Sequence, residues 1–100
     1  MGRSKLAHDE KRAAHVAEVL KALAHPLRLR IVAILCERET HVNDLAQRLE
    51  VSQAIVSQQL RILRMRRLVD VARKDGFAVY RLAEPQLPEL LRCMDGCSVA

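Results

Sequence analysis

The sequence predicts a mainly helical winged helix-turn-helix, in which four helices precede a β-hairpin and one helix follows it (α-α-α-α-β-β-α). Two short runs with apolar residues at helical spacing flank Glu50-Val51-Ser52, and Asp75-Gly76 joins two β-prone runs. The chain has 100 residues, the size of one small domain. It contains no repeat, low-complexity tract or linker, so we expect a single domain over residues 1–100.

The first two helices are separated at His25-Pro26. Apolar residues recur at helical spacing over residues 6–24, which predicts one amphipathic helix there. Proline disfavours the α conformation at the residue before it and suits the first position of a helix, so one helix ends and the next begins at this point. The second helix is expected over residues 26–37, and its apolar density predicts burial. The apolar residues at i, i+3, i+4 and i+7 are Leu29, Val32, Ala33 and Cys36.

The helix-turn-helix itself spans residues 41–64. Its first helix is brief, over residues 42–49, and Ser52 is suited to cap the second because its hydroxyl can accept a backbone N–H of the first turn. Residues at i, i+4 and i+7 of the second helix are expected to face inward: Val56, Leu60 and Leu63. The opposite face carries small, polar and basic side chains: Ala54, Ser57, Gln58, Arg61 and Arg64.

A β-hairpin is expected over residues 68–82, because Asp75-Gly76 is a strong signal for a two-residue hairpin loop. Alternate residues of the two strands then share one face, which we expect to pack against the helices: Val69, Val71, Ala78, Tyr80 and Leu82. Arg73 and Lys74 stand at the tip. A last short helix is expected to begin between residues 85 and 88 and to end near Gly96, which suits a left-handed C-cap.

Composition narrows the class of partner. The net charge of +5 indicates a polyanion, because Lys and Arg displace counterions from phosphate backbones. One Tyr, one Phe and no Trp leave few rings for base stacking, which disfavours single-stranded RNA. No run approaches the ~20 apolar residues that cross a bilayer, and the start of the chain leads into charged residues rather than an apolar signal core, so we expect no membrane partner and a cytoplasmic location. No Cys-x-x-Cys pair, Ser/His/Asp set or glycine-rich phosphate loop is present, and we expect no enzyme.

A basic chain with a readable helix face points to double-stranded DNA, because a helix-turn-helix holds one helix rigidly enough to enter the major groove. Gln58 and Ser57 can reach base edges, and Ala54 can meet a thymine methyl group. The basic residues are expected to touch phosphates, which positions the protein without reading sequence. The expected DNA-binding residues are Ser52, Gln53, Ala54, Ser57, Gln58, Gln59, Arg61, Arg64, Arg73 and Lys74.

The cysteines form a candidate inducer site. Cys93 and Cys97 are four residues apart, so on a continuous helix both thiolates would share one face, and Cys36 could add a third ligand from the same or the other subunit. A trigonal thiolate set suits arsenic(III) or antimony(III), whereas zinc would need a fourth ligand such as a histidine. Two alternatives stay open: a reversible sulfur or oxidant bridge between two thiols, and a merely structural role with Cys36 as a small buried side chain. No cofactor is expected to be required for folding.

The chain resembles the ArsR/SmtB family of bacterial metal- and thiol-responsive repressors over nearly its whole length. The likeness rests on four segments: Leu20-Lys-Ala-Leu-Ala-His-Pro-Leu-Arg-Leu-Arg-Ile31, Ser52-Gln-Ala-Ile-Val-Ser-Gln-Gln-Leu-Arg-Ile-Leu-Arg64, Leu68-Val69 and Val79-Tyr80-Arg81-Leu82. The resemblance implies a homodimer that joins through its first and last helices and places two recognition helices in successive major grooves of a palindromic operator. It also implies a repressor that leaves DNA when an inducer binds.

The chain departs from the family at three places. Glu39-Thr-His-Val-Asn-Asp-Leu45 stands where arsenic and cadmium sensors often show Glu-Leu-Cys-Val-Cys-Asp-Leu, so that dithiol is absent. Gln59 replaces the family's histidine in the recognition helix. Arg67 replaces its usual glycine, so either Arg67 adopts a left-handed conformation or the helix ends differently.

An alternative of another class is a winged-helix protein-interaction module without operator binding. Such a module would be expected to carry an acidic or apolar surface on the second helix of the helix-turn-helix. The residues predicted to be free on that helix are polar and basic instead.

Overall fold

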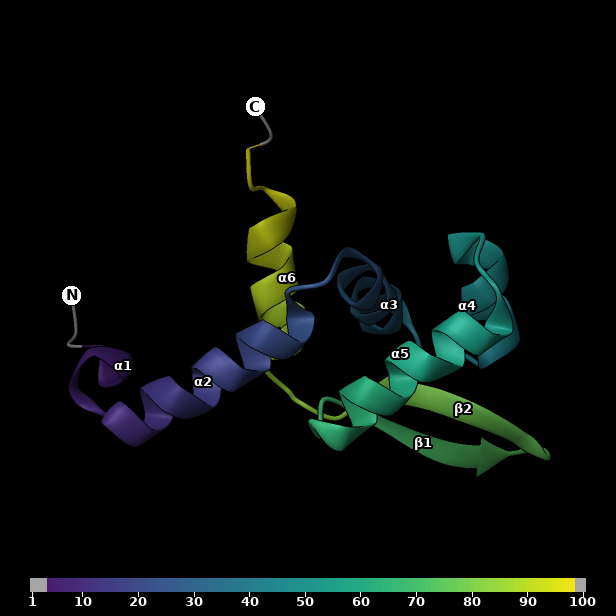
Figure 1. Cartoon of the computed structure of the whole chain (residues 1–100), viewed down its shortest axis with the longest axis horizontal. Helices are drawn as coiled ribbons and strands as arrows, with labels where there is room; N and C mark the ends of the chain where they lie inside the picture. The colour runs from purple at the N-terminus through teal and green to yellow at the C-terminus, as the bar shows by residue number, and fades with distance from the viewer. Residues whose placement is uncertain (1–3, 99–100) are drawn as a thin grey trace.

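The computed structural model describes residues 4–98 and has the predicted winged helix-turn-helix architecture (Figure 1). The helices α3, α4 and α5 and the hairpin form the body. Helices α2 and α6 extend away from this body on the side of α3 opposite α4. In chain order the elements are α1 (Lys5–His8), α2 (Glu10–Leu23), α3 (Pro26–Glu37), α4 (Val42–Leu49), α5 (Gln53–Met65), β1 (Val69–Lys74), β2 (Phe77–Leu82) and α6 (Leu87–Asp95). No helix within residues 4–98 combines the length and the apolar character needed to span a membrane.

The hydrophobic core lies where α3, α4, α5 and the start of β1 meet, and the last turn of α2 and one side of α6 close it. The inward stripe predicted for α5 is confirmed, since Val56, Leu60 and Leu63 are all buried. The other buried apolar residues are Ala22, Leu23, Ile31, Val32, Leu35, Leu45, Ala46, Leu49, Leu68, Val69, Leu87 and Leu91. Because this core holds α5 along its length, the outer face of α5 is presented in a fixed orientation.

The prediction of one helix over residues 6–24 is wrong in one respect, because the helix is broken at Asp9. Asp9 has extended backbone (φ −137°, ψ 100°), and its carboxylate accepts a hydrogen bond from the Arg12 backbone N–H at 3.0 Å. An aspartate in this position caps a new helix rather than continuing the old one. The result is a short α1 followed by α2, which ends at Leu23.

Helix α3 has the predicted bounds, and His25 caps it. The His25 Nδ1 atom accepts from the backbone N–H groups of Leu27 and Arg28, at 3.2 and 3.5 Å, and Pro26 occupies the first position. The predicted burial of Leu29 is wrong, because this side chain is 40% exposed. Helix α3 faces the core with Ile31, Val32 and Leu35, and Leu29 lies outside that contact.

The hairpin has the predicted loop and register. Lys74 pairs with Phe77 and Val69 with Leu82, and Asp75 and Gly76 both have positive φ, at 52° and 82°. Positive φ at both central residues defines a type I′ turn, whose twist matches that of the two flanking strands. The predicted inner face is buried or half-buried, and the loop before α4 joins the sheet edge because Thr40 and Tyr80 exchange backbone hydrogen bonds of 3.1 and 2.7 Å.

The end of α6 differs from the prediction. Gly96 follows the helix but has φ −84°, not a left-handed conformation. The chain leaves α6 through a right-handed turn in which the Cys97 N–H donates to the Met94 carbonyl at 2.9 Å, so no left-handed residue is required. A Cβ atom at position 96 would meet the Cys93 carbonyl at an ordinary 3.7 Å.

Candidate nucleic-acid interface

Caps at both ends of the turn fix the direction of α5. Glu50 adopts a left-handed conformation (φ 57°), and the Glu50 and Val51 N–H groups close the end of α4 on the Gln47 and Ala46 carbonyls. This double hydrogen-bond pattern is a common way to end a helix, although a non-glycine residue occupies the left-handed position here. The Ser52 hydroxyl then accepts from the Ile55 N–H at 3.2 Å, which confirms Ser52 as the cap of α5.

The free face of α5 is the centre of the candidate interface. Ala54, Ser57, Gln58 and Arg61 are exposed and together line a shallow hollow on its surface. Ser52, Gln53 and Arg64 are also exposed on this helix or at its cap. The structure therefore brings most of the expected DNA contacts onto one surface, and their small, polar and basic side chains match what a major groove accepts.

Gln59 differs from the other expected contacts because it is half-buried at the edge of the free face. Its Oε1 atom accepts a hydrogen bond of 3.1 Å from Nη1 of Arg28, on α3. Sequence reasoning did not single out Arg28. The sequence places Arg28 in the first turn of α3, three residues after the capping His25. Its hydrogen bond to Gln59, 31 positions away, becomes visible only in the folded chain.

The predicted basic residues of the wing are exposed but already have partners. The Lys74 ammonium lies 2.7 Å from Glu39, and Arg73 donates to the Gly76 carbonyl at 3.0 Å. The hydrogen bond from Lys74, together with its charge, holds the pKa of the Glu39 carboxyl below its usual value. The Lys74 ammonium is therefore already ion-paired in this structure, and a DNA phosphate would have to compete with Glu39 for it.

Two surface features lie outside the residues predicted from the sequence. Phe77 is 66% exposed at the wing, with its ring centroid 6.4 Å from that of His41. Arg66 and Arg67 extend the basic end of α5, and Arg66 pairs with Glu18 of α2 at 3.0 Å. The run Arg64-Met-Arg-Arg67 is the sequence signal that could have pointed to this end of the helix.

The three thiols are not brought together within one chain. Cys36 is half-buried in a hollow with Arg92 and Asp95, on one side of α6. Cys93 lines a different hollow, and Cys97 lies beyond the end of α6, so the pair does not share a continuous helix. Among residues 4–98 no group of three or more His, Cys, Asp or Glu side chains is placed to hold a metal ion.

The environment of Cys36 also makes it a poor thiolate. Burial raises the pKa of its thiol, and the nearby Asp95 carboxylate raises it further. Arg92 acts in the opposite direction but more weakly. A thiol with a raised pKa is less nucleophilic at neutral pH.

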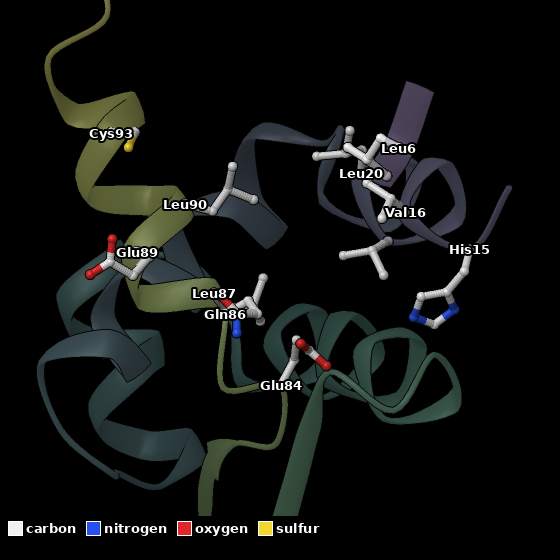
Figure 2. A pocket seen from close by; sticks show the side chains of 11 residues that line it. Leu6, His15, Val16, Leu20, Glu84, Gln86, Leu87, Glu89, Leu90 and Cys93 are labelled. Atoms are coloured by element: carbon white, nitrogen blue, oxygen red, sulfur yellow. The ribbon is translucent and has the colours of Figure 1, made fainter. Parts of the chain in front are cut away.

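Cys93 lies at the rim of an apolar groove between α2 and α6, with a volume of about 460 Å³ (Figure 2). Leu90 of α6 faces Leu20 and Val16 of α2 across it, and Leu6 lies at its outer end. Leu20 is 46% exposed and Leu6 45%. The groove is thus an apolar surface on the side of the chain formed by the first and last helices.

Comparisons with known proteins agree with this geometry. Residues 25–71 match the model of the family described as "Bacterial regulatory protein, arsR family". The chain is 41% identical over 85 residues to the biofilm growth-associated repressor of Agrobacterium fabrum, covering 85% of this chain and 73% of that protein. It is also 33% identical over 85 residues to the transcriptional activator HlyU of Vibrio cholerae, covering 85% of this chain and 79% of that protein.

Solved structures give the same result. The transcriptional repressor BigR from Xylella fastidiosa superposes with a TM-score of 0.86 at 36% identity, over 97% of this chain and 99% of that chain. The homodimeric winged helix-turn-helix DNA-binding domain of Mb0332 from Mycobacterium bovis gives a TM-score of 0.75 at 28% identity, over 94% of this chain and 85% of that chain. The chain belongs to the ArsR/SmtB family of winged helix-turn-helix transcriptional regulators.

Proposed function

We propose that this chain is a homodimeric repressor that acts in the cytoplasm by inserting α5 of each subunit into a major groove of a palindromic operator. The observation that carries the proposal is the contrast across α5, whose inner side is buried and whose outer side holds Ala54, Ser57, Gln58 and Arg61. Repression is favoured by the relatives that are named repressors. One relative is named a transcriptional activator, so the experiments must also measure whether this chain lowers or raises transcription.

The dimer is proposed to form through the first and last helices. The support is the apolar groove between α2 and α6, together with apolar side chains that one chain leaves uncovered. A small domain gains stability when a second copy covers such a surface. The exposed alanine, leucine and methionine residues of α1, α2 and α6 are Leu6, Ala7, Ala13, Ala14, Ala17, Leu20 and Met94.

DNA binding is tested with duplexes that the wild-type chain selects from a random-sequence library. Selection should recover an inverted repeat, and binding should weaken steeply with salt because several phosphates per subunit are neutralised. The double variant Gln58→Ala, Arg61→Ala should lose about tenfold to a hundredfold in affinity for the selected duplex. The matched control is Gln47→Ala, Arg48→Ala on α4. Undiminished binding by the α5 variant would refute the proposed reading face.

Repression is tested with a reporter gene placed behind the selected duplex. Expression should fall when the wild-type chain is supplied and recover with the α5 variant. A rise in expression would make the chain an activator and leave its DNA-binding face intact.

The inducer is proposed to be a thiophilic species that reacts with Cys36, Cys93 and Cys97. Arsenic(III), antimony(III) or a soft metal ion would need thiolates from both subunits, since one chain separates Cys36 from Cys93 on two sides of α6. Reactive sulfur or an oxidant would instead link two thiols covalently. The exposed position of Cys97 and the raised pKa of Cys36 favour an order in which Cys97 reacts first.

Titration of the reduced protein separates these inducers. Arsenite, cadmium, zinc and a polysulfide are each added while binding to the selected duplex is followed, and mass spectrometry then measures bridges between cysteines. Release by arsenite or cadmium without a covalent bridge supports the metal site, and release by polysulfide with a bridge supports the thiol switch. Cys93→Ser and Cys97→Ser should each abolish or weaken release if the residue takes part. Full release by both variants would exclude these two thiols.

A further inference from the structure

Arg28 lies at a junction of three helices. It belongs to the first turn of α3, its Nε atom donates to the Ala22 carbonyl in the last turn of α2 at 2.6 Å, and its Nη1 atom donates to Gln59 Oε1 on α5 at 3.1 Å. The last carbonyls of a helix have no partner inside the helix, so Arg28 satisfies one that α2 leaves open. Arg28 therefore links α5, the proposed recognition helix, to the end of α2.

The chemistry of the contact fixes the orientation of the Gln59 side chain. A guanidinium group has donors only, so the atom of Gln59 that faces Arg28 must be the carbonyl oxygen. The guanidinium is planar and rigid, and its two bonds to Ala22 and Gln59 hold its plane in one position. The Gln59 oxygen is consequently directed toward α3, and no residue within 4–98 accepts a hydrogen bond from its amide nitrogen.

Gln59 is placed where that nitrogen can reach a duplex. It follows Gln58 on α5, and successive helical residues are rotated by about 100°, so Gln59 lies at the edge of the free face. Its half-buried position leaves part of the side chain accessible. A bidentate contact with adenine requires both the oxygen and the nitrogen of a glutamine amide to face the base, and the Arg28 bond directs the oxygen elsewhere.

We propose that Arg28 is a positioning residue for DNA binding, which holds the Gln59 oxygen inward so that Gln59 offers its amide N–H groups to an acceptor on the duplex. The acceptor is a phosphate oxygen or an acceptor atom on a base edge, such as guanine O6 or N7. This inference rests on the proposed DNA binding and assigns a role in it to a residue outside the recognition helix.

A double-mutant cycle tests the proposal with Arg28→Met, Gln59→Met and the combined variant. Two probes are used, the duplex selected by the wild-type chain and a duplex of random sequence. Each single variant should weaken binding about fivefold to tenfold, the loss expected for one hydrogen bond to a charged or polar partner. The combined variant should bind no more weakly than Gln59→Met alone, because Arg28 acts through Gln59.

Arg30→Met is the matched control, since Arg30 is an exposed arginine of the same helix. Its effect should be that of one lost charge and should add to that of Gln59→Met. If Arg28→Met does not fold, as judged by thermal unfolding, Arg28→Lys keeps the charge while replacing the rigid fork. Its loss of affinity should likewise disappear in the Gln59→Met background.

The pattern of affinity losses distinguishes the possible roles of Arg28. Additive losses from Arg28→Met and Gln59→Met would overturn the proposal. A coupled loss confined to the selected duplex supports a base acceptor, and an equal coupled loss on both duplexes supports a phosphate acceptor. A wild-type chain that selects no duplex from the random-sequence library would overturn the proposed function, and with it any role of Arg28 in binding DNA.

Discussion

Helices α5 and α6 both bury an apolar stripe against the same core, but their outer sides differ. The outer side of α5 carries small, polar and basic residues, whereas that of α6 carries Leu90 and Cys93 beside an apolar groove. The caps and hydrogen bonds that orient α5 all lie within one chain. Under the proposed function, one chain completes the DNA-reading surface, whereas the α2–α6 groove is covered by a second copy.

The largest effect is expected from Leu20→Asp in the α2–α6 groove. Leu20 is already 46% exposed, so the fold should persist while a buried carboxylate prevents dimer formation. Affinity for the selected inverted repeat should fall by about a hundredfold or more, because the two recognition helices are no longer linked. Light scattering and fluorescence anisotropy measure the two effects. Ala14→Asp adds the same charge to an exposed position on another side of α2 and should remain a dimer; a dimeric Leu20→Asp would place the interface elsewhere.

Truncating one leucine of α5 and one leucine of α6 tests whether each side chain stabilises its own chain or the dimer. Leu60→Ala removes a fully buried side chain of α5 and should lower the free energy of unfolding by about 2–5 kcal/mol at any protein concentration. Leu90→Ala acts on a half-buried side chain, and its effect should grow with protein concentration because it weakens the dimer. Denaturant unfolding at two concentrations checks both. A concentration-independent effect of Leu90→Ala would show that Leu90 supports only its own chain.

Thiol reactivity compares Cys36, on one side of α6, with Cys97 beyond the end of that helix. Cys36 should be alkylated by iodoacetamide roughly tenfold more slowly than Cys97 near neutral pH, because burial and Asp95 raise the pKa of Cys36 and reduce its thiolate fraction. The gap should narrow as the pH rises through that raised pKa. Mass spectrometry of digested protein follows each site. Asp95→Asn should accelerate Cys36 and Arg92→Gln should slow it; equal effects of the two would contradict the electrostatic cause.

The end of α5 offers a smaller, stabilising change. Arg67 has φ 61°, and the Arg67 and Leu68 N–H groups close the helix on the Arg64 and Leu63 carbonyls. Glycine adopts this conformation without strain, so Arg67→Gly should raise the free energy of unfolding by about 0.5–1 kcal/mol. Arg66→Gly is the control, because Arg66 has φ −89° and should be destabilised by the same substitution. Equal effects would mean that the left-handed position costs nothing here.

The smallest expected effect concerns the wing. The pKa of Glu39 is held below its unfolded value, so the stabilisation from its pair with Lys74 is present above the unfolded pKa and disappears as the pH falls through the lowered one. Glu39→Gln should remove this dependence, which carboxyl NMR titration and acid unfolding can follow. Release of Lys74 should also steepen the salt dependence of DNA binding by about one phosphate contact. An unchanged salt slope would mean that the pair with Glu39 does not keep Lys74 from DNA.

Features that depend on near neighbours along the chain could be predicted from the sequence. Ser52 caps α5, Pro26 begins α3, Asp75-Gly76 forms the hairpin loop and Val56, Leu60 and Leu63 face inward, all as predicted. Each follows from turn chemistry, capping or periodicity over a few residues. Asp9 also acts locally, because its side chain caps α2 and so interrupts the helix. The apolar periodicity on both sides of Asp9 nevertheless predicted one continuous helix.

The side of each helix that another element covers depends on the packing of the whole fold and could not be predicted from local patterns. The tertiary structure left Leu29 exposed, separated Cys36 from Cys93 and joined Lys74 to Glu39 across 35 positions in the sequence. It also placed Arg28 against Gln59, although nothing within either helix requires that pair. Local patterns set the direction of a side chain relative to its own helix, whereas its partner depends on how the helices cross, and that is fixed by packing of the whole core.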